Sequence, residues 1–445
     1  MIQTWRKTSS ELIYSPNVIK DIHMKTIDGY DVKIFTDNIE DTAIEQIRQL
    51  LSIDVFSDCK IRIMPDVHAG AGCVIGFTGN LGDKVIPNIV GVDIGCGMLV
   101  QPFICNNPID FHALNEYILR AIPSGRDFRD ENYLPLSQKY SDIYQNAKQL
   151  ILQLRCYREL KEVRRLYKSI GSLGSGNHFI ELDKDESDLY YLVVHTGSRN
   201  LGKQVADIYQ KLAVKCQSGW DKLMVEKNRI IEEYKQAGRK SELQDVIRNL
   251  HNSFKTCKLT IPQDLCYLQG QFREDYLHDM HICQCWAQIN RKLIVNLIMD
   301  FIVGKGVVSS EEHFRPFESV HNYIGNDNII RKGVISARLG EKCIIPLNMR
   351  DGSLICIGKG NEDWNFSAPH GAGRIMSRSQ AFKEISLEDF KKSMEDVYSE
   401  TVTEYIKDES PMVYKSKHEI MDNINDTVDI ENVIKPVFNF KAADL

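Results

Sequence analysis

Glycine interrupts short apolar runs in three stretches of this chain that lie far apart, and this pattern constrains the fold more than any other feature. The stretches run from Ile61 to about Val100, from Ile170 to Gly202 and from His321 to Arg374. Short runs rich in Val and Ile between glycines predict strands joined by tight turns. Because the three stretches share one character, they predict a single large domain over residues 1–445 rather than several independent domains.

Amphipathic segments separate these stretches. Apolar residues recur at helical spacing between Leu136 and Tyr167, and the segment from about 204 to 301 is mostly charged and amphipathic. The sequence therefore predicts an α+β fold with a glycine-rich β core and a mainly helical, solvated insertion over about 204–301.

Composition limits the compartment and the partners. With 55 basic and 61 acidic side chains the formal net charge is −6, which excludes binding of nucleic acid by bulk charge but leaves room for a local basic groove. The polar start, MIQTWRKTSSEL, lacks the apolar core of a secretory signal, and the apolar stretch Leu293–Val303 is too short for a bilayer. The twelve cysteines have no small-scaffold spacing, so free thiols are expected. We expect a cytoplasmic protein without a membrane anchor, and most simply a monomer.

Four of the twelve histidines lie in glycine-rich, turn-like surroundings. They are His178 in GSGNHF, His195 in VVHTGSRN, His321 in SVHNYIG and His370 in APHGAGR. A lone histidine is more often structural or exposed than functional. Four in the same kind of context favour a shared site.

Asp93 and Cys96, in VGVDIGCGM, add a carboxylate and a thiol to this set. Glycines at 95 and 97 allow the backbone to fold back, so that the two side chains can converge. A thiolate, a carboxylate and imidazoles together suit a borderline divalent ion such as Mn²⁺, Zn²⁺ or Fe²⁺, and a cysteine sulfur can bridge two ions. The alternative is that Cys96 is a small buried residue and Asp93 caps a turn.

A second group, His278, His281, Cys283 and Cys285, resembles a zinc site but belongs to a segment predicted to be helical. Residues two apart on a helix point in different directions, so Cys283 and Cys285 cannot meet at one ion. His281 and Cys285 could meet, but two ligands do not make a structural zinc site.

Common nucleotide-binding patterns are missing. There is no GxxxxGK[ST], and Lys25 precedes Asp28-Gly29 by one residue too many for the Lys-x-Asp-Gly of lysine nucleotidyltransferases. If the chain forms a covalent nucleotide adduct, histidine is the natural nucleophile.

Seven motifs occur in order between about residues 60 and 380. They are MPDVHAGAGCVIG (64–76), VGVDIGCGM, GSLGSGNHFIEL, HTGSRNLG, HNYIG, RKG (331–333) and HGAGR (370–374). This set resembles the motifs of the RtcB RNA ligases. The resemblance implies GTP-dependent joining of an RNA 3′-phosphate or 2′,3′-cyclic phosphate to a 5′-hydroxyl, in tRNA splicing or RNA repair. It also implies two Mn²⁺ ions, a histidine–GMP intermediate, an RNA(3′)pp(5′)G intermediate and an activating protein as a candidate partner.

The resemblance assigns residues by their place in these motifs. His370 is implied as the nucleophile, with Asp66 beside it to set its tautomer. The implied metal ligands are Asp93, Cys96, His178, His195 and His321, with Cys96 as the bridge. The implied nucleotide pocket is Asn177, His178, Phe179, Ile180, Glu181, His321, Asn322, Pro346, Leu347, Asn348, Met349, Ser353, His370, Gly371, Ala372, Gly373, Tyr414 and Lys441. Arg199 and Arg374 are implied to hold RNA phosphates, the alternative being surface or structural ion pairs.

Two departures indicate a divergent, bacterial-type member. The segment IPLNMRDGS carries Leu347, Asn348 and Arg350 where the family has small residues, and the chain ends in VFNFKAADL after Lys435-Pro436. Two other functions remain open: a two-metal phosphoesterase that acts on RNA ends without ligation, and a catalytically silent RNA-end binder.

Overall fold

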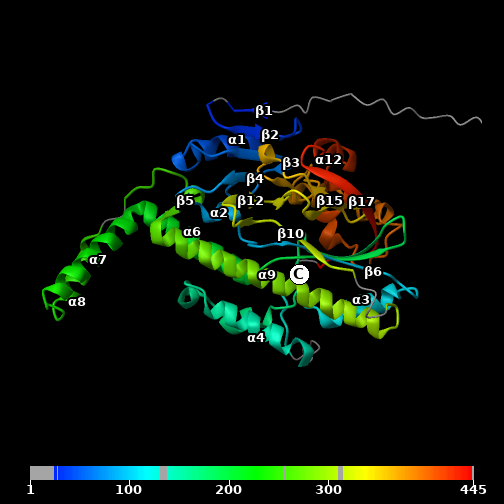
Figure 1. Cartoon of the computed structure of the whole chain (residues 1–445), viewed down its shortest axis with the longest axis horizontal. Helices are drawn as coiled ribbons and strands as arrows, with labels where there is room; N and C mark the ends of the chain where they lie inside the picture. The colour runs from blue at the N-terminus through cyan, green and yellow to red at the C-terminus, as the bar shows by residue number, and fades with distance from the viewer. Residues whose placement is uncertain (1–24, 28, 131–137, 255–256, 309–313, 443–445) are drawn as a thin grey trace, which may run out of the picture.

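The structure is a computed structural model that describes residues 25–442 apart from residue 28 and the segments 131–137, 255–256 and 309–313. Two sheets and the helices around them form an α+β fold, as predicted (Figure 1). The predicted helix from Leu136 begins at Gln138 in the described part of the chain, and positions 136–137 lie outside it.

The first sheet has six strands in the order β1-β2-β3-β4-β12-β11, in which β2 and β3 are parallel and the other neighbours antiparallel. Its strands are β1 Lys25–Thr26, β2 Val32–Ile34, β3 Ile61–His68, β4 Ile75–Asn80, β12 Ile329–Lys332 and β11 Tyr323–Ile324. Two short ribbons accompany it: β13 Val334–Ser336 with β16 Ser367–Pro369, and β5 Lys84–Val85 with β9 Leu268–Gln269.

The second sheet has seven antiparallel strands in the order β10-β6-β8-β7-β17-β15-β14. They are β10 Phe317–Val320, β6 Gly97–Phe103, β8 Tyr190–Thr196, β7 Phe179–Lys184, β17 Val428–Phe440, β15 Gly352–Gly358 and β14 Lys342–Asn348. The two edge strands approach each other, because the Ile344 amide of β14 donates to Ser319 Oγ of β10 at 3.0 Å. The sheet therefore curls almost into a closed barrel.

Helices surround these sheets. They are α1 Asp41–Leu51, α2 Pro87–Val90, α3 Phe111–Ala121, α4 Gln138–Leu152, α5 Val163–Lys168, α6 Arg199–Lys215, α7 Asp221–Gln236, α8 Leu243–Ser253, α9 Gly270–Gly304, α10 Arg378–Glu384, α11 Leu387–Ser393 and α12 Lys417–Asn423. Short 3₁₀ turns lie at Asp54–Phe56, Tyr157–Glu159, Gln263–Leu265, Glu362–Trp364, Glu404–Glu409 and Pro411–Val413, and a π turn at Cys216–Trp220.

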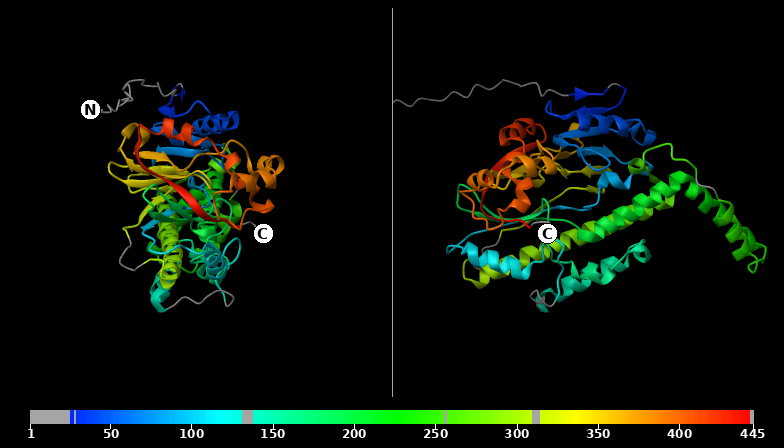
Figure 2. Two further views of the ribbon diagram at one scale, coloured as in Figure 1. Left: turned by 90° about the vertical axis from the view of Figure 1, so that its right-hand side faces the viewer. Right: turned by 180° about the vertical axis from the view of Figure 1, so that it is seen from behind.

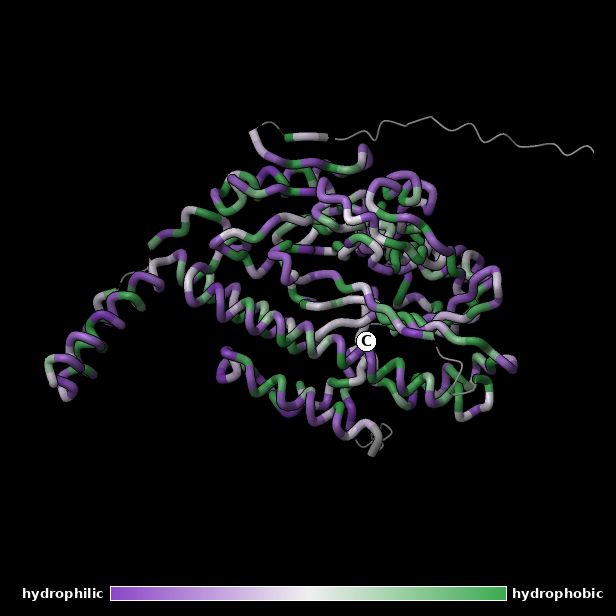
Figure 3. The backbone as a smooth tube through the Cα atoms, in the orientation of Figure 1, coloured by the Kyte–Doolittle hydropathy of each residue, from purple (hydrophilic) through white to green (hydrophobic). Residues whose placement is uncertain are grey.

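The segment predicted as a solvated insertion consists of two packed helices and two projecting helices. Helices α6 and α9 pack against the body of the molecule, and α9 buries Trp286 and Arg291. Only α7 and α8 project as an arm (Figures 1 and 2), and α8 has no buried residue. Along this arm hydrophilic and hydrophobic residues alternate (Figure 3), whereas the apolar positions of α9 face a core. Charge content alone does not distinguish these cases, because a long buried helix also carries an exposed charged face.

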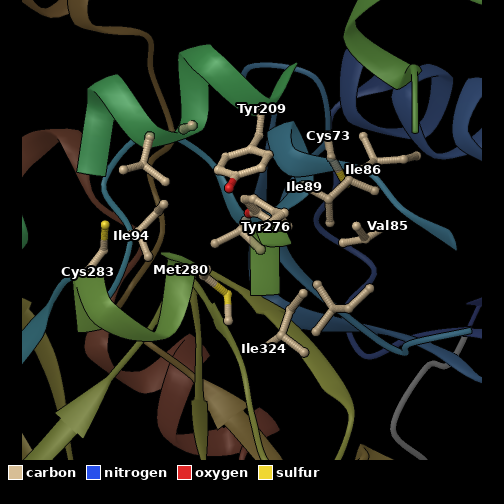
Figure 4. Close-up of a cluster of buried hydrophobic side chains, with 14 of the residues drawn as sticks. Cys73, Val85, Ile86, Ile89, Ile94, Tyr209, Tyr276, Met280, Cys283 and Ile324 are labelled. Atoms are coloured by element: carbon tan, nitrogen blue, oxygen red, sulfur yellow. The ribbon is translucent and has the colours of Figure 1, made fainter. Parts of the chain in front are cut away.

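A buried cluster joins the helices to the first sheet. Figure 4 shows Tyr209 of α6 beside Tyr276 and Met280 of α9, with Ile89 of α2 opposite them. Burial of each such side chain contributes about 1.5–3 kcal/mol. This packing holds α9 rigidly beneath the strands that carry the site.

Helix α9 also fixes backbone around the site. Its Asn290 Oδ1 accepts from the Gly171 amide at 2.7 Å, and its Arg291 Nη1 donates to the carbonyls of Gly95 and Thr196 at 2.8 and 2.7 Å. Among the described residues, no helix has both the length and the apolar character that crossing a bilayer requires.

Candidate metal centre and nucleotide cavity

Strand register brings the predicted metal ligands together. His195 of β8 lies opposite Met98 of β6, and Cys96 immediately precedes β6. His321 follows β10, whose last residue pairs with Gly97, and its amide donates to the Cys96 carbonyl at 2.7 Å. Adjacent antiparallel strands place opposite side chains about 4.5–5.5 Å apart. Residues from three distant segments therefore lie close together at one end of these neighbouring strands.

The ligand atoms meet in two groups of three that share Cys96: Asp93, Cys96 and His178, and Cys96, His195 and His321. Cys96 Sγ lies 3.4 Å from His178 Nε2 and 3.3 Å from His195 Nε2. His195 Nε2 lies 3.3 Å from His321 Nε2, and His178 Nε2 lies 2.9 Å from Asp93 Oδ2.

Backbone carbonyls orient two of the imidazoles. His178 Nδ1 lies 3.0 Å from the Leu173 carbonyl, and His195 Nδ1 lies 3.0 Å from the Asn177 carbonyl. Because a carbonyl only accepts, His195 Nδ1 carries the proton and its Nε2 presents a lone pair, whereas His178 is held between the Leu173 carbonyl and the Asp93 carboxylate. The Cys96 sulfur lies close to one Nε2 atom from each ligand group, so it is positioned to contact an ion in either group.

Burial favours the neutral forms of His195, His321 and the Cys96 thiol in the absence of an ion. It lowers the pKa of His195 and His321, and the neighbouring imidazoles lower it further. Burial, reinforced by Asp93, raises the pKa of the Cys96 thiol. Neutral imidazoles are ready to ligate, whereas the thiolate requires the charge of a bound cation. The donor set therefore fits the predicted pair of borderline divalent ions, with Cys96 available to both.

His370 stands beside this cluster and is held by Asp66. Its Nδ1 lies 2.7 Å from Asp66 Oδ2, which also accepts the His370 amide at 3.2 Å, and its ring centroid lies 4.8 Å from that of His321. The carboxylate holds the proton on Nδ1, so that Nε2 presents the lone pair. Gly373 permits the close approach: it has φ +75°, and a Cβ there would lie 2.5 Å from the Asp66 carbonyl oxygen.

A cavity of about 1080 Å³ opens in front of His370 and the metal ligands. The predicted nucleotide residues that line it are Asn177, Phe179, Glu181, His321, Asn322, Pro346, Leu347, Asn348, Met349, His370, Gly371, Ala372, Gly373, Tyr414 and Lys441. Its size is sufficient for a nucleotide triphosphate together with part of a second substrate.

His178, Ile180 and Ser353 were also predicted to bind nucleotide, but none of the three is among the described residues that line the cavity. Ile180 lies between Phe179 and Glu181 on β7, and strand alternation turns it into the core on the opposite face. Ser353 is fully buried on β15, opposite Pro346, which does line the cavity.

Glu181 is buried at one end of the cavity. Asn439 Nδ2 donates to its Oε1 at 2.7 Å. Burial raises the pKa of Glu181 to about 7, against the opposing effects of Asn439 and Lys441. A single proton there changes both the charge and the hydrogen-bonding role of the carboxyl group.

Local sequence patterns contain no signal for Glu409, a second buried carboxylate of the cavity lining. It accepts from Tyr414 Oη at 2.7 Å and from Lys441 Nζ at 2.9 Å, and it pairs with Arg374 and Arg378 at 3.4 and 3.3 Å. Although burial opposes ionisation, these cations lower its pKa to about 2. Glu409 comes from a polar turn, so its role becomes visible only when the fold places three cations from elsewhere in the chain beside it, together with the nearby Tyr414.

The two predicted RNA-binding arginines have different positions. Arg374 lines the cavity but also donates to the Asp408 carbonyl at 2.6 Å, whereas Arg199 is not among the described lining residues. Arg199 lies behind His178, with Nη1 3.2 Å from Nδ1 of that ring. The alternative of a structural role therefore gains support for Arg199, and Arg374 combines an ion pair with a place at the cavity.

The divergent segment forms a turn at the cavity rim. Asn348 Oδ1 accepts the amides of Arg350 and Asp351 at 3.0 and 2.8 Å, and Arg350 pairs with Asp351 in an exposed position. Asn348 and Met349 line the cavity, while the exposed Arg350 is not among the described residues that line it.

The histidines and cysteines of α9 do not form a third metal group among the described residues. Cys283 is fully buried, and His278 bonds to Asp279. Cys285 Sγ lies 3.7 Å from His281 Nε2, and these are the two residues that the sequence predicted could meet. The prediction that helical geometry separates them is confirmed.

Comparison with known proteins identifies the family of this chain. Residues 46–442 match the family model described as tRNA-splicing ligase RtcB. The chain belongs to the RtcB family. The RNA-splicing ligase RtcB of Escherichia coli K12 is 30% identical over 407 residues, which cover 86% of this chain and 90% of that protein. The tRNA-splicing ligase RtcB of Methanococcus maripaludis is 23% identical over 96% of both chains, and the RNA-splicing ligase RtcB of Mycobacterium bovis is 24% identical over 81% of this chain. These identities make it a divergent member of the RtcB family.

Proposed function

We propose that this protein joins an RNA 3′-phosphate or 2′,3′-cyclic phosphate end to a 5′-hydroxyl end at the expense of GTP, in tRNA splicing or RNA repair. One observation carries the proposal: Asp66 presents the Nε2 lone pair of His370 to a large cavity that also contains the two ligand groups. A hydrolase needs no nucleophile in that position.

In the first step His370 Nε2 attacks the α-phosphorus of GTP. The N–P bond forms, the bond to the bridging oxygen breaks, and pyrophosphate leaves. The imidazole gains positive charge as this happens, and the Asp66 carboxylate 2.7 Å from Nδ1 stabilises that charge. A 2′,3′-cyclic end is first opened by water to give a 3′-phosphate. An oxygen of the 3′-phosphate then attacks the phosphorus of GMP, the bond to His370 Nε2 breaks, and the RNA(3′)pp(5′)G end forms. The 5′-hydroxyl finally attacks the 3′ phosphorus and displaces GMP.

Asp93, Cys96 and His178 would hold one Mn²⁺ ion, and Cys96, His195 and His321 the other. When bound, such ions neutralise phosphate charge and polarise the reacting P–O bonds.

Glu181 supports a preference for guanine. Guanine presents two adjacent N–H donors on its Watson–Crick edge, which an ionised carboxylate accepts together, whereas adenine presents an acceptor there. Lys441 and Tyr414 line the same cavity and are held by Glu409. Arg374 and the half-exposed Arg378 also line the cavity, and their positive charges can contact RNA phosphates.

Labelled GTP tests the proposal directly. Purified protein with Mn²⁺ should form an acid-labile, alkali-stable protein–GMP adduct, and His370→Ala should reduce it at least 1,000-fold because no nucleophile remains. His418→Ala, at an exposed position on α12, is the matched control and should form the adduct at the wild-type level.

Absence of the adduct in wild-type protein loaded with Mn²⁺ would refute the ligase proposal. Cleavage of cyclic phosphate ends without joining would then favour the phosphoesterase, and RNA binding without turnover would favour the silent binder. The same assay with GTP and ATP side by side decides the guanine preference.

A further inference from the structure

His68 is a cavity residue for which the proposed steps provide no role. It ends β3, two residues beyond Asp66; the His68 side chain lines the cavity, while the Asp66 side chain contacts His370. Two residues along a strand span about 6.6 Å. The imidazole of His68 therefore stands about one strand repeat from the residue that holds the nucleophile.

The tautomer of His68 is fixed by the backbone. Its Nδ1 lies 2.9 Å from the Asp66 carbonyl oxygen, which only accepts, so Nδ1 carries the proton. Nε2 then carries the lone pair and is the ring nitrogen that a cavity ligand can use. This arrangement is that of a neutral base, not of a phosphate-binding cation.

The surrounding charges favour the neutral ring. Burial lowers the pKa of His68, and His370 and Arg374 lower it further, while Asp66 opposes them. Glu40, which precedes α1, also lines the cavity, but its Oε1 accepts the Ala69 amide at 2.7 Å. A base that stays neutral at physiological pH can accept a proton there.

The joining step requires such a base. A 5′-hydroxyl is a poor nucleophile until its proton is taken, and in that step the departing GMP occupies the space in front of His370. His68 lies beside that space, on the wall formed by β3 and by the residues that follow Gly373.

We propose that His68 Nε2 is the general base that accepts the proton of the RNA 5′-hydroxyl in the joining step. The inference rests on the proposed ligase function. As the proton moves to Nε2, the 5′ oxygen forms a bond to the phosphorus of the RNA 3′-phosphate. The bond from that phosphorus to the bridging oxygen breaks, GMP leaves with the electron pair, and His68 later returns its proton to water.

A step-resolved assay of His68→Gln tests this role, because the glutamine amide can still donate to the Asp66 carbonyl but cannot act as a base. The full chain is incubated with Mn²⁺, GTP, an RNA ending in 3′-phosphate and a second RNA with a 5′-hydroxyl. We expect the protein–GMP adduct to form within threefold of the wild-type rate, the GMP-capped 3′ end to accumulate, and joining to slow about 10²- to 10⁴-fold. His418→Gln is the matched control.

His68→Ala provides a second measurement that does not depend on the glutamine. Added imidazole should increase the joining rate of His68→Ala at least fivefold and leave the joining rate of the wild type unchanged. Joining within threefold of wild type in His68→Gln overturns the inference, as does slow joining that imidazole does not rescue. If the wild type forms no adduct, the proposed function itself fails, which is distinguishable because adduct formation precedes the step assigned to His68.

Discussion

Replacement of Asp66 gives the sharpest quantitative test of how the nucleophile is held. Asp66 is fully buried, and its Oδ2 accepts two N–H groups of the same residue, the amide and the ring Nδ1 of His370. In Asp66→Asn the side-chain oxygen should keep that position, because an NH₂ group there would face two donors. The tautomer of His370 would be retained, and only the negative charge would be lost.

The magnitude follows from the two kinds of hydrogen bond. A bond to a charged partner contributes about 1.5–3 kcal/mol and a neutral bond about 0.5–1.5 kcal/mol, so Asp66→Asn should lose about 1–2 kcal/mol of stabilisation as His370 becomes positive. At about 1.4 kcal/mol per tenfold change, adduct formation should slow roughly 5- to 30-fold. Asp66→Ala removes both bonds and frees the ring, so it should slow the reaction at least about 100-fold.

The assay is the single-turnover rate of adduct formation at saturating GTP, with thermal unfolding measured for each variant. Asp58→Asn, at an exposed position, is the control and should match the wild type. Equal losses in Asp66→Asn and Asp66→Ala, with both proteins folded, would show that the asparagine does not preserve the tautomer. A wild-type rate in Asp66→Asn would show that the carboxylate charge does not assist the nucleophile.

Two further predictions concern Cys96, as a proposed ligand of both metal ions, and Glu181, as the residue proposed to recognise guanine. Cys96→Ala should abolish tight binding of both Mn²⁺ ions in equilibrium dialysis, because both ligand groups contain that sulfur, while the exposed Cys257→Ala should bind as the wild type does; loss of one ion alone would show that Cys96 is not shared. Because burial raises the pKa of Glu181 to about 7, its carboxylate forms as the pH rises through that value, so KM for GTP should fall between about pH 6 and 8 and Glu181→Gln should remove this dependence. A KM that stays constant over this range in the wild type contradicts a role for the ionised group.

The local sequence was a good guide to the strands and to most of the chemistry. Short glycine-punctuated runs predicted the segments that form β3, β4 and β6, and the four histidines in turn-like contexts all lie at Cys96 or at the cavity, although His68, which also lines the cavity, was not singled out. Helical periodicity also separated Cys283 from Cys285 correctly. These features depend on residues a few positions apart, and the periodicity of a helix or strand directly converts such spacing into the directions of the side chains.

Features that depend on tertiary packing could not be predicted from the local sequence. Charge content suggested that all of 204–301 is solvated, yet α9 is a buried support for the site and only α7 and α8 project. Ile180 was assigned to the nucleotide pocket with its neighbours, although the face a strand residue presents depends on which side of the sheet holds the core.

The residue types and their order determined by themselves which chemistry this chain can perform: one thiol, one carboxylate and four imidazoles beside turns, in the motif order of a single family. Only the tertiary structure decided which nitrogen of each ring is free and where Glu409 draws its four partners together. Those outcomes depend on single carbonyl and carboxylate oxygens that the folded backbone places within about 3 Å of their partners, as Asp66 is placed beside His370 from a distant part of the chain, and local patterns do not encode such distances.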